Sequence, residues 1–316
     1  MASDLTQYSR DVDHFFSSLS KEAFEEVPCL LCKTPTESVL LFHKGTQEIR
    51  RCLCGLVWNA HQAKEDALVS FYQESSALKR WSEIKETPGE IRRQEQKFLA
   101  TVKYLARFYV RSVLDVGCGN GLFLSLLNAA LPEARLTGSD LSPDAGTACG
   151  KRGVRWKSWD LKQALVNNPE TYDAITLWGV LEHVKDPVSV LRAASARLNP
   201  NGFLVVCVPN VQSLVVTHLW EKCFTFCPQH LWHFDHSSLT SALSQAGFES
   251  VQWRTVEPER VPTLKVMAGL DPYLPSPEWS YAVAKNVLLD EDILKQGLGY
   301  KIVLIAQASQ CKPDAA

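Results

Sequence analysis

Three glycines and an aspartate stand between two apolar runs in the segment VLDVGCGNGLFL, residues 113–124. Gly117, Gly119 and Gly121 occupy alternate positions, and Asp115 precedes them. Glycine prefers neither helix nor strand, so this cluster indicates a backbone that turns tightly or approaches a ligand closely. If the segment joins a strand to a helix, the N–H groups at the helix start also face that ligand.

A second acidic residue, Asp140, ends the segment ARLTGSD, 25 positions after Asp115. A carboxylate at the end of a second strand can accept hydrogen bonds from both hydroxyls of a ribose. The glycine pattern is D-x-G-x-G-x-G, which differs from the G-x-G-x-x-G of dinucleotide sites, and no G-K-[ST] follows to hold phosphates. The expected ligand therefore carries a ribose and need not carry a phosphate.

Ten cysteines include two close pairs near the N-terminus, Cys29 with Cys32 and Cys52 with Cys54. Two such pairs can supply four thiolates to one tetrahedral zinc ion. The role of that zinc would be structural, because four protein ligands leave no open position for catalysis. The alternative is a metal-free module with four reduced thiols. The other six cysteines are expected to fill core space.

Four of the eight histidines lie at 183, 230, 233 and 236, and the last three of these are in the segment PQHLWHFDH. Histidine is the usual base near neutral pH, so we select His230 and His233 as candidates for substrate contact or proton removal. His183, in the segment LEHV, is a third candidate. The alternative is that these histidines cap loops and hold the segment in place.

Strands and helices must alternate from residue 112 onward to position these groups. Strands are predicted at 112–116, 134–140, 154–160, 172–180, 203–208, 251–256 and 301–308, and helices at 121–130, 142–153, 186–198 and 236–248. Such alternation is typical of βαβ units, which build a mainly parallel sheet with helices on both faces. Ligands bind such sheets at the carboxyl ends of the strands, where the glycine cluster falls.

The remaining segments are less patterned. Residues 1–27 indicate an N-terminal arm, 28–60 hold the cysteine pairs between β-like pieces, and 61–110 are helical and charged. Phe98, Val102, Leu105 and Tyr109 recur at helical spacing and predict one apolar face. Residues 255–280 hold five prolines and interrupt the pattern. This insertion is either a lid over the site or a solvated connector.

The overall composition narrows the class of protein. The 316 residues are 46% hydrophobic, with 33 basic and 35 acidic side chains, so the strongly basic footprint of a nucleic-acid-binding protein is absent from the sequence. No apolar run has the length of a membrane helix, and the N-terminus lacks the pattern of a signal peptide. We therefore expect no membrane insertion and a cytoplasmic, reducing location.

The stretch from 112 to about 250 resembles a class I S-adenosylmethionine-dependent methyltransferase. Five motifs carry the resemblance in order: LDVGCGNG, GSDLS, KSWDL, ITLWGVLEHVKDP and LNPNGFLVVCVPN. The resemblance implies an α/β fold with a Rossmann-like, doubly wound, seven-stranded and mainly parallel sheet, helices on both faces, and a small N-terminal Cys-rich module. It divides the chain into an arm with a zinc-ribbon-like module at 1–60, a helical connector or lid at 61–110, and the methyltransferase domain at 111–316.

The resemblance also implies residue roles. The cofactor-binding residues are expected to be Asp115, Gly117, Cys118, Gly119, Asp140, Leu141, Trp159, Asp160, Trp178 and Val180. The glycine loop would lie under the methionine part and Asp140 would bind the ribose. Asp160 would bind the adenine amino group, with Leu141 and Trp159 on its ring, although simple core packing is the alternative for these two. Trp178 and Val180 would line the pocket near the sulfonium.

Two further segments resemble one subgroup of the family, which includes ubiquinone-pathway-like O-methyltransferases and sugar or antibiotic methyltransferases. PQHLWHFDH resembles its H-L-x-H-F segment. RCLCGLVW resembles the end of its zinc-ribbon-like segment, C-x-x-C-G-L-V-F, but its cysteine pair is one residue shorter. In this subgroup the connecting helices often cover the cofactor, so Tyr72 and Trp81 either close the pocket or are core aromatics.

The expected function is methyl transfer from S-adenosylmethionine to a small-molecule acceptor, with a hydroxyl of a secondary metabolite, sugar or quinone-like compound favoured over carbon. The fourth motif reads LWGVLEH, without an N-P-P-Y or Pro-Cys sequence, which argues against nucleic-acid bases as substrates. The alternatives are C-methylation of a related or carrier-bound acceptor, and a non-catalytic cofactor-binding interaction module. The sequence does not address the oligomeric state.

Overall fold

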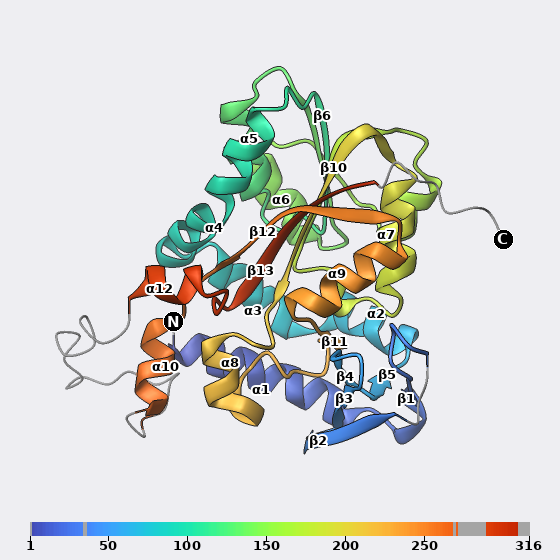
Figure 1. Ribbon diagram of the computed structural model, residues 1–316, viewed down its shortest axis with the longest axis vertical. Helices are drawn as coiled ribbons and strands as arrows, with labels where there is room; N and C mark the ends of the chain where they lie inside the picture. The colour runs from blue at the N-terminus through green and yellow to red at the C-terminus, as the bar shows by residue number, and fades with distance from the viewer. Residues whose placement is uncertain (1, 34–36, 268–269, 271–288, 309–316) are drawn as a thin grey trace. The chain divides into compact units, whose positions relative to one another are not determined.

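The computed structural model describes residues 2–33, 37–267, 270 and 289–308 of the chain (Figure 1). The chain forms two compact units, each built from separate stretches. Unit 1 comprises Met1–Arg80, Pro209–Ser238 and Arg254–Val303, and unit 2 comprises Trp81–Val208, Leu239–Trp253 and Leu304–Ala316. Both units cross the boundaries of the expected segments 1–60, 61–110 and 111–316. The division of the chain into those three segments remains a prediction.

A seven-stranded sheet, most of which lies in unit 2, has the order β12-β13-β10-β9-β6-β7-β8. Its strands are β6 (Ser112–Val116), β7 (Arg135–Ser139), β8 (Trp156–Lys157), β9 (Tyr172–Trp178), β10 (Leu198–Pro209), β12 (Phe248–Val256) and β13 (Lys301–Ala308). The five strands from β8 to β10 are parallel neighbours. The predicted Rossmann-like α/β fold with a mainly parallel sheet is confirmed.

Strand β6 lies inside this sheet, between β9 and β7, and marks a reversal of strand order. The chain adds β7 and β8 on one side of β6, and β9 and β10 on the other. All five residues of β6 are buried, as are 174–177 of β9 and 202–209 of β10. Such continuous apolar runs are expected of parallel strands covered on both faces. The reversal places the carboxyl ends of β6, β7 and β9 around one crevice, where ligands bind in this class of sheet.

Helices of unit 2 connect and precede the strands. They are α4 (Pro88–Ala106), α5 (Leu122–Ala130), α6 (Pro143–Lys151), α7 (Pro187–Ser195) and the short π and 3₁₀ turns Gln163–Asn167 and Leu181–His183. Helix α7 begins at Asp186, whose Oδ1 accepts a hydrogen bond from the Ser189 N–H at 3.0 Å. Helix α3 (Ser76–Lys85) and helix α9 (His236–Gln245) each continue from unit 1 into unit 2.

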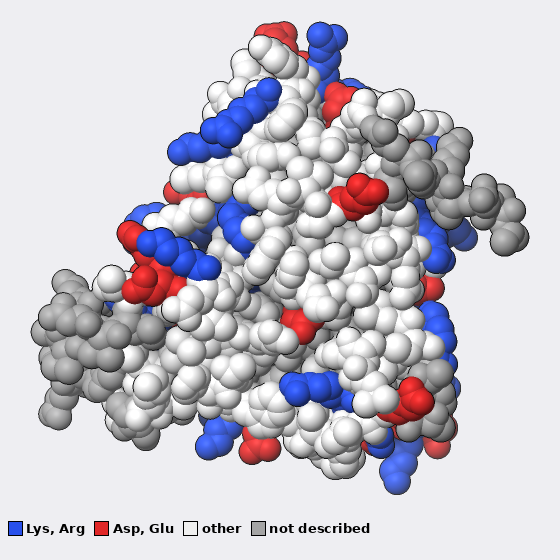
Figure 2. Space-filling model, in the orientation of Figure 1, with Lys and Arg blue, Asp and Glu red and all other residues white. Residues whose placement is uncertain are grey.

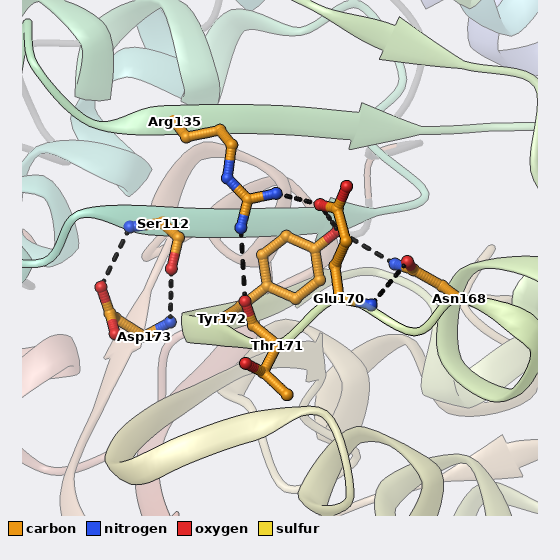
Figure 3. Close-up of polar contacts among 7 residues, drawn as sticks. All are labelled: Ser112, Arg135, Asn168, Glu170, Thr171, Tyr172 and Asp173. Atoms are coloured by element: carbon orange, nitrogen blue, oxygen red, sulfur yellow. Dashed lines mark hydrogen bonds and ion pairs between the residues drawn. The ribbon is translucent and has the colours of Figure 1, made fainter.

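A network of polar contacts joins the amino ends of β6 and β9, at the edge opposite the glycine loop (Figure 3). Asp173 Oδ2 accepts hydrogen bonds from the backbone N–H groups of Arg111 at 2.8 Å and Ser112 at 3.1 Å. Ser112 Oγ accepts from the Asp173 N–H at 3.0 Å. Burial alone would raise the pKa of Asp173, but hydrogen bonds from Asn199, Arg111 and Ser112 outweigh burial and lower it.

The same network extends to the amino end of β7 (Figure 3). Arg135 forms an ion pair with Glu170 and lies over the Tyr172 ring, with its guanidinium carbon 5.2 Å from the ring centroid. Tyr172 donates its hydroxyl proton to Glu170 at 3.2 Å and accepts from Asn168 Nδ2 at 2.9 Å. These contacts hold the starts of three neighbouring strands in register and leave their opposite ends for binding.

Unit 1 contains two smaller sheets. A four-stranded antiparallel sheet has the order β11-β4-β3-β2, and a two-stranded sheet pairs β1 with β5. The strands are β1 (Phe24–Glu26), β2 (Ser38–Lys44), β3 (Gln47–Cys52), β4 (Val57–Asn59), β5 (His61–Ala63) and β11 (Trp232–His233). Its helices are α1 (Ala2–Ser18), α2 (Glu65–Glu74), α8 (Leu214–Leu219), α10 (Arg260–Met267), α12 (Asp290–Lys295) and the 3₁₀ turns Lys21–Ala23 and Trp220–Lys222.

Strand β11 connects distant parts of the chain within unit 1. Trp232 pairs with Trp58 and His233 with Val57, so the segment after β10 returns to the N-terminal sheet. The core beneath this sheet is likewise non-local: it joins Phe42 and Ile49 to Val216, Phe226 and residues near 300. Phe42 and Phe226 meet edge to face, with ring centroids 5.0 Å apart.

Some sequence expectations were wrong in detail. Tyr109 lies beyond the end of α4, at φ +50° and 85% exposed, so it does not belong to the apolar face, whereas Phe98, Val102 and Leu105 are buried as expected. The third strand is shorter than predicted, because only Trp156–Lys157 pair with β7. The insertion at 255–280 begins with helix α10, and three of its five prolines lie outside the described residues.

Among the described residues, no helix is long and apolar enough to cross a membrane. On the face shown in Figure 2, acidic and basic side chains are interspersed between broad uncharged areas.

Candidate functional site

The glycine loop follows β6 and requires the conformational freedom of glycine. Gly117, Gly119 and Gly121 have φ values of +71°, +51° and +72°, in the left-handed region. The carbonyl oxygen of Ser139 accepts hydrogen bonds from the N–H groups of Gly117 at 2.8 Å and Cys118 at 3.0 Å. These bonds bend the loop over the end of β7 before α5 begins.

The loop is also closely packed. A Cβ atom at Gly117 would lie 2.8 Å from Val180 Cγ2, and one at Gly138 would lie 2.7 Å from Cys118 Sγ. The Cys118 thiol is buried and lies 3.8 Å from the thiol of Cys149 on α6. The Cys118 side chain thus packs inside the unit, and a cofactor contact from this residue would come from its backbone.

Asp140 links the loop to the next helix. Its Oδ2 accepts a hydrogen bond from the Gly119 N–H at 3.0 Å, and its Oδ1 accepts from the Ser142 N–H at 2.8 Å. Burial raises the pKa of Asp140, and these N–H groups oppose the rise. The Leu141 N–H is a third donor to this carboxylate, which accepts up to about four hydrogen bonds, so capacity for a ligand hydroxyl remains.

Asp115 lies within the sheet directly below the loop. Only 1% of it is exposed, and its Oδ1 accepts a hydrogen bond from Thr176 Oγ1 at 2.5 Å. Burial raises the pKa of Asp115 to about 7, the Thr176 hydroxyl lowers it, and the charge of Asp140 raises it further. Sequence reasoning missed Thr176, because only the pairing of β6 with β9 reveals that it faces Asp115.

The residues expected around the adenine lie on the surface of unit 2. Leu141 is 46% exposed, and Trp159 and Asp160 are half-buried, so full core packing does not describe them. Asp160 Oδ1 accepts a hydrogen bond from the Gln163 N–H at 2.6 Å, and Gln163 Oε1 accepts from the Asp160 N–H at 2.9 Å. This reciprocal pair fixes the orientation of the Asp160 carboxylate.

Trp178 ends β9 beside the glycine loop. Its ring packs against Phe98 of α4 and Phe123 of α5, with centroid distances of 4.7 and 5.1 Å. Its indole N–H is buried and has no hydrogen-bond partner among the described residues. A buried donor of this kind is costly, and a polar ligand atom would satisfy it. Val180 follows after Gly179 and contacts the loop at Gly117.

The four N-terminal cysteines converge in unit 1. The Sγ atoms of Cys29, Cys32, Cys52 and Cys54 all lie within 4.8 Å of one another, and those of Cys29 and Cys54 are 3.6 Å apart. Zinc with four thiolates at about 2.3 Å requires sulfur atoms roughly 3.8 Å apart, so the arrangement fits the ion. The shortened second pair still reaches the cluster, because Gly55 at φ +95° turns the chain tightly.

Cys29, Cys32 and Cys52 differ in pKa. Burial raises the pKa of Cys29, and the neighbouring thiols raise it further. Burial also raises the pKa of Cys32. Burial alone would raise the pKa of Cys52, but hydrogen bonds from the Cys54 backbone and the neighbouring thiols outweigh burial and lower it. A bound zinc ion would deprotonate its cysteine ligands.

Two of the three candidate histidines belong to unit 1. His230 and His233 lie in unit 1 with ring centroids 6.5 Å apart, and His183 belongs to unit 2. His230 Nδ1 is 2.8 Å from the carbonyl oxygen of Thr225. His233 is buried in β11 against Phe226, and burial lowers its pKa to about 3, with a further lowering by Lys44.

The two candidate lid aromatics have packing partners. Tyr72, on α2, lies 5.4 Å from the Phe71 ring. The Lys85 ammonium lies 4.3 Å from the Trp81 ring centroid on α3, a cation–π contact. Whether either closes a pocket remains a prediction.

Comparison with known proteins agrees with this geometry. Residues 89–252, just over half of the chain, match the family described as "Methyltransferase domain". The ubiquinone biosynthesis O-methyltransferase of Bordetella bronchiseptica (strain ATCC BAA-588 / NCTC 13252 / RB50) is 30% identical over 161 residues, which cover 46% of this chain and 66% of that protein. The ubiquinone biosynthesis O-methyltransferase of Xanthomonas campestris pv. campestris (strain B100) is 35% identical over 104 residues, which cover 31% of this chain and 43% of that protein.

Solved structures match over a larger part of the fold. An O-methyltransferase family protein from Burkholderia thailandensis superimposes with a TM-score of 0.51 at 16% identity, covering 77% of this chain and 62% of that one. The plantazolicin methyltransferase BpumL, solved with a pentazolic desmethylPZN analog and SAH, gives a TM-score of 0.52 at 19% identity, covering 77% and 95%.

The glycine loop, the acidic ends of β6 and β7 and the family match together define the class of protein. The chain belongs to the methyltransferase-domain family. It spans just under two thirds of the length of the Bordetella bronchiseptica relative.

Proposed function

We propose that this enzyme transfers the methyl group of S-adenosylmethionine to a hydroxyl group of a small-molecule acceptor, with His230 as the base. The contact between His230 Nδ1 and the carbonyl oxygen of Thr225 supports the proposal. A carbonyl oxygen only accepts hydrogen bonds, so Nδ1 is the donor, and Nε2 is the nitrogen that would take a hydroxyl proton during attack on the methyl group.

His233 has a different role in this proposal. A histidine whose pKa lies near 3 is too weak a base to take a proton efficiently at neutral pH. Its buried Nε2 has no hydrogen-bond partner among the described residues. His233 therefore contacts the acceptor as a neutral polar group. His183, which follows β9 in unit 2, is proposed as a further acceptor contact.

The cofactor site follows the predicted assignment. The methionine part lies over Gly117, Cys118 and Gly119, and the buried acid Asp115 faces the same loop. The positive φ values of Gly117 and Gly119 and the close approach of Val180 to Gly117 support this placement.

The remaining cofactor contacts lie on the loops after β7, β8 and β9. Asp140 binds the ribose hydroxyls, and Asp160 binds the adenine amino group, with Leu141 and Trp159 against the ring. Trp178 and Val180 line the methyl-transfer region. The buried unpartnered indole N–H of Trp178 supports this role, since a ligand acceptor would satisfy it.

The acceptor is proposed to be a hydroxylated secondary metabolite, sugar or quinone-like compound. The support is the name shared by several relatives, ubiquinone biosynthesis O-methyltransferase. The near-neutral net charge of the chain supports a small molecule over a nucleic acid.

We also propose that the four-cysteine cluster holds one structural zinc ion through Cys29, Cys32, Cys52 and Cys54, and that the protein works in the cytoplasm. The nine cysteines of the described residues are free thiols, which supports a reducing compartment. Zinc there would join the two cysteine turns without entering the reaction.

The test uses the full-length protein, S-adenosylmethionine with an isotope-labelled methyl group, and a small-molecule extract of the source cells. Mass spectrometry then identifies any compound that gains the labelled methyl group, and fragmentation separates O- from C-methylation. Asp140→Ala, which loses a ribose contact, is the negative control. His230→Gln keeps the polarity of the side chain but removes the base, and kcat should fall about 10²- to 10⁴-fold.

The outcomes separate the alternatives. A labelled ether that depends on Asp140 and His230 supports the proposal. A labelled carbon centre replaces it with C-methylation. No labelled compound, with S-adenosylhomocysteine still bound, contradicts a small-molecule acceptor and favours a carrier-bound acceptor or an interaction module.

A further inference from the structure

Asp115 has a single hydrogen-bond partner for its side chain among the residues that the structure describes. Asp115 on β6 stands directly opposite Thr176 on β9 and opposite Gly138 on β7. Glycine offers no side chain, and the space at Gly138 is filled by the Cys118 thiol. Thr176 Oγ1 lies 2.5 Å from Asp115 Oδ1, and Thr176 is fully buried.

The direction of this hydrogen bond fixes its effect. A threonine hydroxyl has one proton, and at this distance it donates that proton to Oδ1, which leaves Oδ2 as the second acceptor of the carboxylate. A hydrogen bond donated to a carboxylate favours its ionised form, whereas burial disfavours that form. Among the described residues, Thr176 is thus the one hydrogen-bond donor that favours the ionised form of Asp115 against the effect of burial.

The charge of Asp115 matters because of the ligand. S-adenosylmethionine and its product S-adenosylhomocysteine share the α-ammonium and α-carboxylate groups, but only S-adenosylmethionine carries a positive sulfonium, which becomes a neutral thioether in the product. A buried carboxylate under the loop stabilises the cationic form more than the neutral one, since charges interact strongly at low dielectric. The other titratable side chains whose charge acts on Asp115 are Asp140, at the end of β7, and the thiols Cys118 and Cys149.

We propose that Thr176 is a positioning residue, which holds the Asp115 carboxylate ionised and oriented so that the site binds the cationic cofactor in preference to its neutral product. The proposal rests on the cofactor role of Asp115 in the proposed function. It assigns to β9 a residue that touches neither the cofactor nor the acceptor and acts only through Asp115. The chemical consequence is release of the product after each methyl transfer.

The test measures the dissociation constants of S-adenosylmethionine and S-adenosylhomocysteine by calorimetry from pH 5.5 to 9 (about the range in which a raised carboxyl titrates). In the wild type, affinity for S-adenosylmethionine should fall as the pH drops through about 7, because Asp115 becomes protonated. Thr176→Val removes the donor at nearly constant shape, and it should move this midpoint upward by about one pH unit. Near pH 7 this corresponds to an affinity loss of up to about tenfold.

Three controls make the result specific. Thr176→Ser keeps the hydroxyl and should restore the wild-type profile. Asp115→Asn has no acid to titrate, so the pH dependence assigned to Asp115 should disappear, and adding Thr176→Val to it should change the profile no further. If Thr176→Val does not fold, Thr176→Cys, which provides a weaker donor, should give a smaller shift in the same direction.

A Thr176→Val profile that superimposes on the wild type, or equal shifts for both ligands, overturns the inference. Wild-type affinity in Asp115→Asn at every pH also overturns it, by removing the acid on which it rests. That last result does not contradict the proposed methyl transfer, because the acceptor assay with labelled methyl groups tests methyl transfer separately.

Discussion

Replacing Gly117 by alanine tests whether this position of the glycine loop has neither the conformation nor the space for a side chain. Gly117 has φ +71°, and an added Cβ would lie 2.8 Å from Val180 Cγ2. Both effects act on the folded state, and they are separable because only the second involves Val180.

The expected magnitude is the sum of two terms. A left-handed conformation costs a non-glycine residue about 1–2 kcal/mol. Overpacking by one methyl group costs about 1–3 kcal/mol more. Gly117→Ala should therefore lower the free energy of unfolding by about 2–5 kcal/mol, which for a domain of this size is roughly 6–15 °C in Tm.

The assay is thermal and denaturant unfolding of four proteins: wild type, Gly117→Ala, Val180→Ala and the double variant. In the double variant, the loss of stability from overpacking should disappear, and the loss from the left-handed conformation should remain. Gly150→Ala is the matched control, because Gly150 on α6 has an ordinary φ and open space, and alanine there should stabilise by up to about 1 kcal/mol. A Gly117→Ala protein as stable as wild type, or a double variant no better than Gly117→Ala, would refute the reasoning.

Three other predictions concern the cysteine cluster, the half-buried Asp173 and the buried Asp115. The purified protein should contain one zinc per chain by elemental analysis, and Cys32→Ser should lose it while Cys207→Ser, outside the cluster, retains it. Hydrogen bonds hold the pKa of Asp173 below its usual range, so its stabilisation is present above pH 4 or so and lost as the pH falls through the lowered pKa. Asp173→Asn should therefore cost about 1 kcal/mol at neutral pH in urea unfolding and much less near pH 3. The pKa of Asp115 is raised, so its ionisation destabilises the cofactor-free fold as the pH rises from 4 towards 7. Asp115→Asn should accordingly melt higher than wild type at pH 8, and an equal or lower Tm there would contradict the assignment.

Local patterns predicted much of unit 2. The expected strands 112–116 and 301–308 match β6 and β13, and the glycine cluster falls where left-handed backbone is needed. These features depend on short-range chemistry: buried parallel strands need continuous apolar runs, and tight turns need glycine. The four-cysteine cluster was predicted from the spacing of two close cysteine pairs, which is typical of zinc ligands.

Long-range pairing explains what the sequence did not reveal. Trp232 and His233 form a two-residue strand only because Trp58 and Val57 lie beside them, and no local period marks so short a strand. Thr176 is similar, because a threonine in an apolar strand has no visible role until the register places it opposite Asp115. Tyr109 continued a helical period past the point where the helix ends at Ala106.

The pairing of β11 with β4 has a consequence for biosynthesis. During translation, β4 emerges from the ribosome long before its partner at residues 232–233, so one edge of the N-terminal sheet stays uncovered while most of the chain is made. An unpaired strand edge is a template for misassociation, and contacts of such long separation form slowly. The cysteine module therefore depends on a distant segment of the chain to complete its sheet. Ribosome-bound chains halted before residue 232 should remain protease-sensitive around Val57, and they should become protected only after β11 has left the ribosome.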